Sequence, residues 1–132
     1  MKRAAIFLTF FFFAISLISC EREDGKWDDN IKLSQKNVTV NSNANTIEIT
    51  TQSTYWWLNE ISFNGNNADL SSIDKFSKNF IYTTSDYKVE RKEDGKKIII
   101  IMNENSSNLN RSLIVGLQNG DYFDGIKVIQ SK

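Results

Sequence analysis

The chain has 132 residues with 16 basic and 16 acidic side chains, no histidine, no proline and one cysteine. This charge balance argues against a nucleic-acid-binding protein, which needs a clustered positive face for phosphates. Without histidine or a second thiol, the chain lacks the usual groups for general base catalysis, metal ligation and internal disulfides. We therefore expect neither an enzyme nor a bound metal or cofactor.

The first nineteen residues have the layout of a secretory signal. Lys2 and Arg3 precede an apolar block over residues 4–18, and fifteen residues are too few for a helix that must span a bilayer with about 20. A retained transmembrane helix is thus the less favoured alternative. Leu17-Ile18-Ser19-Cys20 resembles the signal of bacterial lipoproteins, which implies cleavage before Cys20, acylation of Cys20 and attachment to a membrane through its acyl chains.

Removing residues 1–19 from the 132 would leave 113 residues, the size of one domain. Residues 20–30 are charged and predict a flexible tether, and residues 31–132 predict the folded domain. Acidic residues in the tether resemble the surface-export signal of Bacteroidetes lipoproteins, although a solvated linker explains them equally well: Glu21, Glu23 and Asp24. We expect an outer-membrane anchor on the cell surface, with the periplasmic face as the alternative.

From Ile31 onward, apolar and polar residues alternate with the period of β-strands. Residues 38–40 and 46–51 predict two strands, which the polar turn cluster at 41–45 joins into a hairpin. Residues 55–63 predict a further strand with a kink in its middle.

Residues 64–80 interrupt this alternation, which indicates an insertion. Apolar residues recur there at helical spacing: Leu70, Ile73 and Phe76. With Asp69 or Ser71 as the N-cap, the segment predicts one short helix.

Alternation returns at residues 87–91 and 97–102, and Asp94-Gly95 between them predicts a β-hairpin. Residues 98–101 are apolar at every position, which indicates a strand that is central or buried on both sides. Residues 113–117 and 126–130 predict the last two strands. About seven short strands with frequent turns predict an all-β antiparallel β-sandwich.

Three stretches in order resemble a known family. NVTV and NTIEIT lead to Trp56 or Trp57, an asparagine-rich turn at Asn105 leads to Arg111, and the chain ends in Val128-x-Gln130. This pattern is similar to the BACON domain of Bacteroidetes proteins. Over residues 31–132 the resemblance implies an immunoglobulin-like β-sandwich and a carbohydrate-binding role.

The first candidate site is Tyr55 with Trp57. Neighbours on a strand point to opposite faces, so Tyr55 and Trp57 face solvent if Trp56 and Leu58 face the core. Exposed aromatic rings pack against the apolar faces of sugars. The reading that we favour over this platform is that the segment 64–80 covers Trp57.

The second candidate site is the loop at residues 119–125, which contains Tyr122 and Phe123 between two carboxylates. Such a loop could hold calcium or a sugar. The spacing lacks a calcium-loop pattern, so an ordinary hairpin turn is the favoured reading. Arg111 is expected to be structural, paired with a carboxylate or a turn carbonyl.

Together these features predict a lipid-anchored, non-catalytic binding or adhesion module of the cell envelope, with a glycan or glycoprotein as its ligand. One alternative is a structural or accessory subunit of an outer-membrane or surface complex, docked through a sheet edge or residues 70–80. A small hydrolase with paired carboxylates is the least favoured alternative. No nucleic-acid partner is expected.

Overall fold

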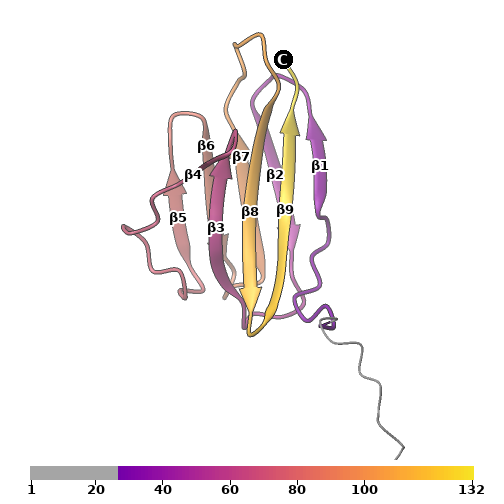
Figure 1. The fold of residues 1–132 in the computed structure, drawn as a ribbon, viewed down its shortest axis with the longest axis vertical. Helices are drawn as coiled ribbons and strands as arrows, with labels where there is room; N and C mark the ends of the chain where they lie inside the picture. The colour runs from indigo at the N-terminus through magenta and orange to yellow at the C-terminus, as the bar shows by residue number, and fades with distance from the viewer. Residues whose placement is uncertain (1–26) are drawn as a thin grey trace, which may run out of the picture.

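The computed structural model describes residues 27–132, which form two stacked β-sheets (Figure 1). The predicted signal segment, the predicted lipid attachment site Cys20 and most of the predicted tether lie outside the described residues. No helix between residues 27 and 132 is long and apolar enough to cross a membrane. The strands are β1 (Asn37–Val40), β2 (Asn45–Thr50), β3 (Trp57–Phe63), β4 (Asn66–Asn67), β5 (Phe80–Thr83), β6 (Tyr87–Lys92), β7 (Lys97–Met102), β8 (Arg111–Asn119) and β9 (Tyr122–Gln130).

The five-stranded sheet has the order β1-β9-β8-β3-β4, and the four-stranded sheet has the order β2-β7-β6-β5. All neighbouring strands are antiparallel except β1 and β9, which are parallel. The orders β9-β8-β3 and β2-β7-β6 correspond to strands G-F-C and B-E-D of the immunoglobulin fold. The predicted all-β, immunoglobulin-like sandwich is therefore confirmed.

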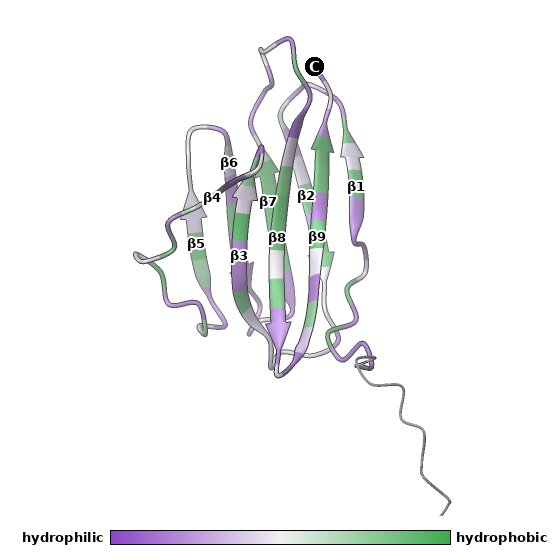
Figure 2. Cartoon of the chain, in the orientation of Figure 1, coloured by the Kyte–Doolittle hydropathy of each residue, from purple (hydrophilic) through white to green (hydrophobic). Residues whose placement is uncertain are grey.

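The core lies between the two sheets and is built from alternate residues of each strand. Figure 2 shows hydrophobic and hydrophilic residues alternating along β9, where Ile126 and Val128 are fully buried. Each such side chain contributes roughly 1.5–3 kcal/mol through burial. Ile31 before β1 is also fully buried, so the segment ahead of the first strand packs with the core that the described residues form.

The hairpin predicted around Asp94-Gly95 is confirmed as β6 and β7. The backbone turns through residues 93–95, which all have φ between 53° and 86°. The predicted central strand is also confirmed, because β7 lies between β2 and β6. Ile98 and Ile100 face the core, while Ile99 on the opposite face is only 8% exposed.

The hairpin predicted from residues 38–40 and 46–51 is wrong. β1 and β2 lie in different sheets: β1 pairs with the last strand, so that Val38 lies opposite Val128, and β2 pairs with β7. The turn at 41–44 therefore carries the chain from one sheet to the other. Turn residues mark a change of direction and do not specify the next strand's partner.

The helix predicted within residues 64–80 is also wrong. The segment contains β4 and a series of short turns. Side chains accept hydrogen bonds from backbone N–H groups two residues further along the chain: Asp69 Oδ1 from Ser71 N at 2.9 Å, Asp74 Oδ1 from Phe76 N at 3.0 Å and Ser77 Oγ from Asn79 N at 3.1 Å. Such local side-chain bonds compete with a helical backbone. Leu70 and Ile73 still pack against the core, but Phe76 does not.

Candidate functional site

At the start of β3, consecutive aromatic residues point to opposite faces of the five-stranded sheet. Trp56 is 2% exposed and Leu58 is fully buried, so the condition under which Tyr55 and Trp57 face away from the core is met. Trp57 lies between them and pairs with Gln118 of β8, so its side chain lies on the outer face. The alternation thus places one indole in the core and one beside solvent.

The ring of Phe76 covers part of Trp57. The two ring centroids are 5.5 Å apart, with the ring planes tilted by 40°. Trp57 is half-buried and Phe76 is 68% exposed. The segment 64–80 therefore covers Trp57 in part, and it contributes a second exposed ring to the same surface.

Tyr55 precedes β3 and is 79% exposed. The Lys78 Nζ atom lies 5.9 Å from the centre of its ring, a distance at which a cation is attracted to an aromatic face. Tyr55 and Trp57 thus each lie against the segment that follows β4. We call Tyr55, Trp57 and Phe76 the aromatic surface.

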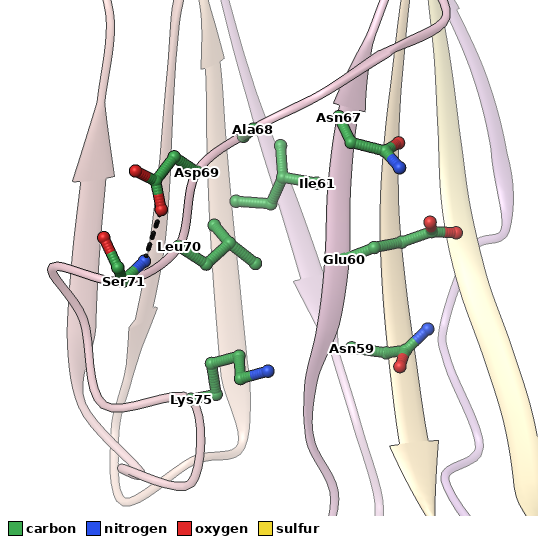
Figure 3. A pocket seen from close by; sticks show the side chains of 9 residues that line it. All are labelled: Asn59, Glu60, Ile61, Asn67, Ala68, Asp69, Leu70, Ser71 and Lys75. Atoms are coloured by element: carbon green, nitrogen blue, oxygen red, sulfur yellow. Dashed lines mark hydrogen bonds between the residues drawn. The ribbon is translucent and has the colours of Figure 1, made fainter.

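Next to the aromatic surface, a groove of about 350 Å³ separates β3 from residues 68–75 (Figure 3). Backbone hydrogen bonds close its two ends, from Ala68 N to Ile61 O at 2.8 Å and from Leu58 N to Lys75 O at 3.0 Å. Ile61, Ala68 and Leu70 supply the apolar part of the lining. The polar lining residues are Asn59, Glu60, Asn67, Asp69, Ser71 and Lys75.

The β3 side of the groove depends on a bulge and a glycine. The register of β3 against β8 shifts between Leu58 and Glu60, leaving Asn59 as the extra residue. Glu60 then lies across Gly116, where an added Cβ would be only 2.7 Å from Glu60 Cγ. Gly116 therefore allows the glutamate to lie flat on the sheet beside the groove.

The loop side of the groove carries a stable negative charge. The backbone N–H and the hydroxyl of Ser71 hydrogen-bond to Asp69 and lower its pKa, so Asp69 is ionised at neutral pH. Figure 3 shows Lys75 extending from the same loop toward β3. Amides, carboxylates, a hydroxyl and an ammonium group can donate to and accept from sugar hydroxyls, while adjacent aromatic rings can pack on a sugar face.

The two aromatic residues of the second candidate site point to opposite faces of β9. Tyr122 is half-buried against the core, and its hydroxyl donates to Asp124 Oδ2 at 3.1 Å. Phe123 is 59% exposed and lies opposite Gln118 on the outer face. Since Gln118 also pairs with Trp57, Phe123 and Trp57 share that face at about 10 Å, twice the interstrand spacing. Tyr122 does not share it.

The loop at 119–125 is a tight hairpin turn, as favoured from the sequence. Asn119 pairs with Tyr122, leaving Gly120, with φ +61°, and Asp121 at the tip. Its second carboxylate, Asp124, forms an ion pair with Lys36 at 2.7 Å. Within residues 27–132, no group of three or more acidic, histidine or cysteine side chains could hold a metal ion.

At the opposite end of the sandwich, two of the motifs noted in the sequence come together. Arg111 donates to Asp86 Oδ1 at 2.8 Å, to Asn103 O at 2.7 Å and to Gln130 Oε1 at 3.1 Å. Asn105, which is also buried, joins the neighbouring loop to the C-terminal segment through Ser131 O at 2.8 Å. The structural role expected for Arg111 is confirmed.

Sequence reasoning missed Phe76 and the groove as candidate site features. The sequence predicted Phe76 on the buried face of a helix, whereas the segment that lines the groove consists of short turns. The irregular composition of residues 64–80 was the available signal, since insertions beside a regular sheet often carry binding residues.

Comparisons with known proteins bear on the fold. No family model and no curated protein matches the chain. It is similar to the NMR structure of a protein from Bacteroides thetaiotaomicron, with a TM-score of 0.65 and 18% identity, over 83% of this chain and 93% of that one. It also overlaps a Bacteroides ovatus GH5 xyloglucanase in complex with a XXXG heptasaccharide, with a TM-score of 0.46 and 18% identity, over 76% of this chain.

The chain spans only 18% of the xyloglucanase, so this overlap is no evidence of catalysis by this chain. The Bacteroides thetaiotaomicron structure shares the fold at an identity too low to carry a function. The fold and site define an all-β, immunoglobulin-like sandwich with an exposed aromatic surface beside a polar groove.

Proposed function

We propose that the protein is a non-catalytic binding module that holds a glycan, free or on a glycoprotein, at the aromatic surface and the adjacent groove. The observation that carries this proposal is the contact between Trp57 and Phe76, two rings that stay accessible beside a polar groove. A sugar ring needs this combination, because its faces are apolar while its hydroxyls require hydrogen-bond partners.

The location that we propose is the outer membrane, facing the cell surface, with attachment through acyl chains on Cys20. The lipoprotein-like signal and the BACON-like strand spacing support this reading, and a Bacteroides protein with the same fold is compatible with it. Mass spectrometry of the native protein tests the anchor directly. We expect a mature N-terminus at an acylated Cys20, and an unmodified Cys20 would contradict the anchor.

The glycan-binding proposal is tested with a protein comprising residues 21–132, which contains every described element. We expect it to bind on a glycan array or in a mucin pull-down, and Trp57→Ala to reduce the affinity at least tenfold, on the order of 1–3 kcal/mol for a lost aromatic contact. Leu109→Ala is the matched control, because Leu109 is also exposed, at 74%, but lies in the loop between β7 and β8.

Two outcomes would contradict this proposal. If the protein binds neither the array nor mucin, the glycan is not the ligand. If a folded Trp57→Ala protein binds as well as the Leu109→Ala control, the ligand lies elsewhere on the molecule. Co-purification of one stoichiometric partner protein, lost on deletion of residues 64–80, would instead support the accessory-subunit function.

A further inference from the structure

Arg91 on β6 is a charged side chain inside the core. It is 1% exposed, and its guanidinium carbon lies 3.4 Å from the centre of the Trp56 ring. Burial lowers its pKa to about 10, although the charge of nearby Asp94 raises it. The group is therefore charged at neutral pH, and the fold must compensate a cation removed from water.

The compensation comes from four backbone carbonyl groups. Arg91 Nη1 donates to Trp56 O at 2.9 Å and to Ser77 O at 3.0 Å, Nη2 donates to Thr54 O at 2.9 Å, and Nε donates to Gly95 O at 3.4 Å. A guanidinium group can do this because its five N–H donors spread in one plane. Arg91 thus joins three chain segments that are distant in sequence.

The carbonyls of Thr54, Trp56 and Ser77 lie in the two segments that carry the aromatic surface. Tyr55 stands between the first two, Trp57 follows Trp56, and Phe76 precedes Ser77. One side chain therefore bonds to the backbone on both sides of the Trp57–Phe76 contact, where the Leu58 N to Lys75 O hydrogen bond also joins the two segments. The segment at 68–79 has only short turns of its own, so its position against β3 depends on such long-range bonds.

Core filling alone does not explain an arginine at this position. A hydrophobic side chain of similar volume often replaces a buried charge with little loss of stability or with a gain. A hydrophobic residue would, however, leave the carbonyls of Thr54, Trp56 and Ser77 without the donor that they share. The guanidinium holds these backbone segments in fixed positions through hydrogen bonds, which a hydrophobic side chain cannot form.

We propose that Arg91 is a positioning residue, which holds Trp57 and Phe76 in contact and so preforms the surface for its ligand. The ligand is the glycan of the proposed function, on which this part of the inference rests. A preformed surface avoids the entropy cost of ordering side chains on binding. We therefore expect loss of Arg91 to weaken glycan binding on the order of tenfold while the core stays folded.

The experiment compares Arg91→Met with Arg111→Met in the protein comprising residues 21–132. Arg111 is the matched control, because it is also a buried arginine bonded to a backbone carbonyl, but at the opposite end of the sandwich. Nuclear Overhauser contacts between the Trp57 and Phe76 rings report their proximity without any ligand. We expect Arg91→Met to lose these contacts and Arg111→Met to keep them.

If folded Arg91→Met keeps the ring contacts as Arg111→Met does, the positioning role is refuted. If Arg91→Met does not fold, Arg91→Lys takes its place, because lysine keeps the charge but cannot span all the carbonyls. Weakened ring contacts are expected there, and unchanged contacts would refute the role. Failure of the wild-type protein to bind mucin would remove the glycan proposal, while the ring contacts would still decide the role of Arg91.

Discussion

Asp124→Asn should weaken the attachment of the N-terminal segment to β9. The Asp124 side chain is 9% exposed and accepts from Lys36 Nζ at 2.7 Å, while Lys36 also reaches Asp29 Oδ2 at 3.2 Å. The hydrogen bonds to Asp124 and then to Asp29 raise the pKa of Lys36 against the opposing effect of burial. These three side chains join residues 29–36, which run from the last residues of the predicted tether to just before β1, to strand β9.

The expected loss of stability follows from the exposure of the pair. A hydrogen bond to a charged group contributes about 1.5–3 kcal/mol, but Lys36 is 42% exposed, so solvent screening reduces the coupling to about 1 kcal/mol. Asparagine retains an oxygen that accepts from the Tyr122 hydroxyl. We expect the free energy of unfolding to fall by about 1–2 kcal/mol, which lowers the urea midpoint by roughly 0.5–1 M.

Urea unfolding at pH 7, followed by tryptophan fluorescence, measures this change in the protein comprising residues 21–132. A double-mutant cycle with Lys36→Met should give an interaction free energy of about 1 kcal/mol. Asp121→Asn is the control, since Asp121 is exposed at the turn and should change stability by less than about 0.5 kcal/mol. A coupling near zero, or Asp124→Asn as stable as the control, would refute the reasoning.

Two further predictions concern the core around Arg91 and Tyr87. Gly95→Ala should lower the free energy of unfolding by about 2–3 kcal/mol, because Gly95 has φ +86° and an added Cβ would lie 2.7 Å from Arg91 Nη2. Gly65→Ala, with φ +82° and no atom within 4 Å, should cost only about 1 kcal/mol; equal losses in urea unfolding would contradict the clash. Burial raises the pKa of Tyr87 to about 12, so its contribution to stability is complete below its unfolded pKa of about 10 and is lost as the pH rises toward 12. Unfolding measured between pH 9 and 12 should show a smaller loss in Tyr87→Phe, and an identical loss in both proteins would contradict this assignment.

Local patterns in the sequence predicted the tight turns and seven of the nine strands that the structure describes. They missed β4 and β5, and they did not predict pairing across the molecule. The β6–β7 hairpin was predictable because both strands and the Asp94-Gly95 turn are adjacent in the chain. The parallel pairing of β1 with β9 was not, because it joins Asn37 to Lys127 and no nearby residue encodes that partner. The wrong hairpin at residues 38–51 is the consequence.

The candidate site was predictable in part. Alternation along residues 55–58 was sufficient to predict that Trp56 and Trp57 point to opposite faces, but it did not decide which of the two faces the core. The spacing of Leu70, Ile73 and Phe76 fits a helix, but serine and aspartate side chains bond to nearby backbone N–H groups and favour turns. Because these turns replace the helix, Phe76 lies beside Trp57 and not in the core.

The role of Arg91 had a signal in the sequence that pattern reading did not use. Tyr87, Val89 and Arg91 alternate on one face of a strand, which places a charged residue at an inward position. An arginine there needs partners within the fold. Those partners are carbonyl groups of remote segments, which no local motif identifies.

The most direct test of glycan binding uses the indole N–H signals of the three tryptophans of the chain, Trp27, Trp56 and Trp57, in an NMR titration with mucin-derived oligosaccharides. Trp27 is 61% exposed and Trp56 is 2% exposed, so they serve as an exposed and a buried control. We predict that the chemical shift of the Trp57 indole N–H changes with oligosaccharide concentration and reaches a plateau, while the Trp27 and Trp56 signals do not change. No shift at any concentration, or a shift confined to Trp27, would contradict glycan binding at the aromatic surface.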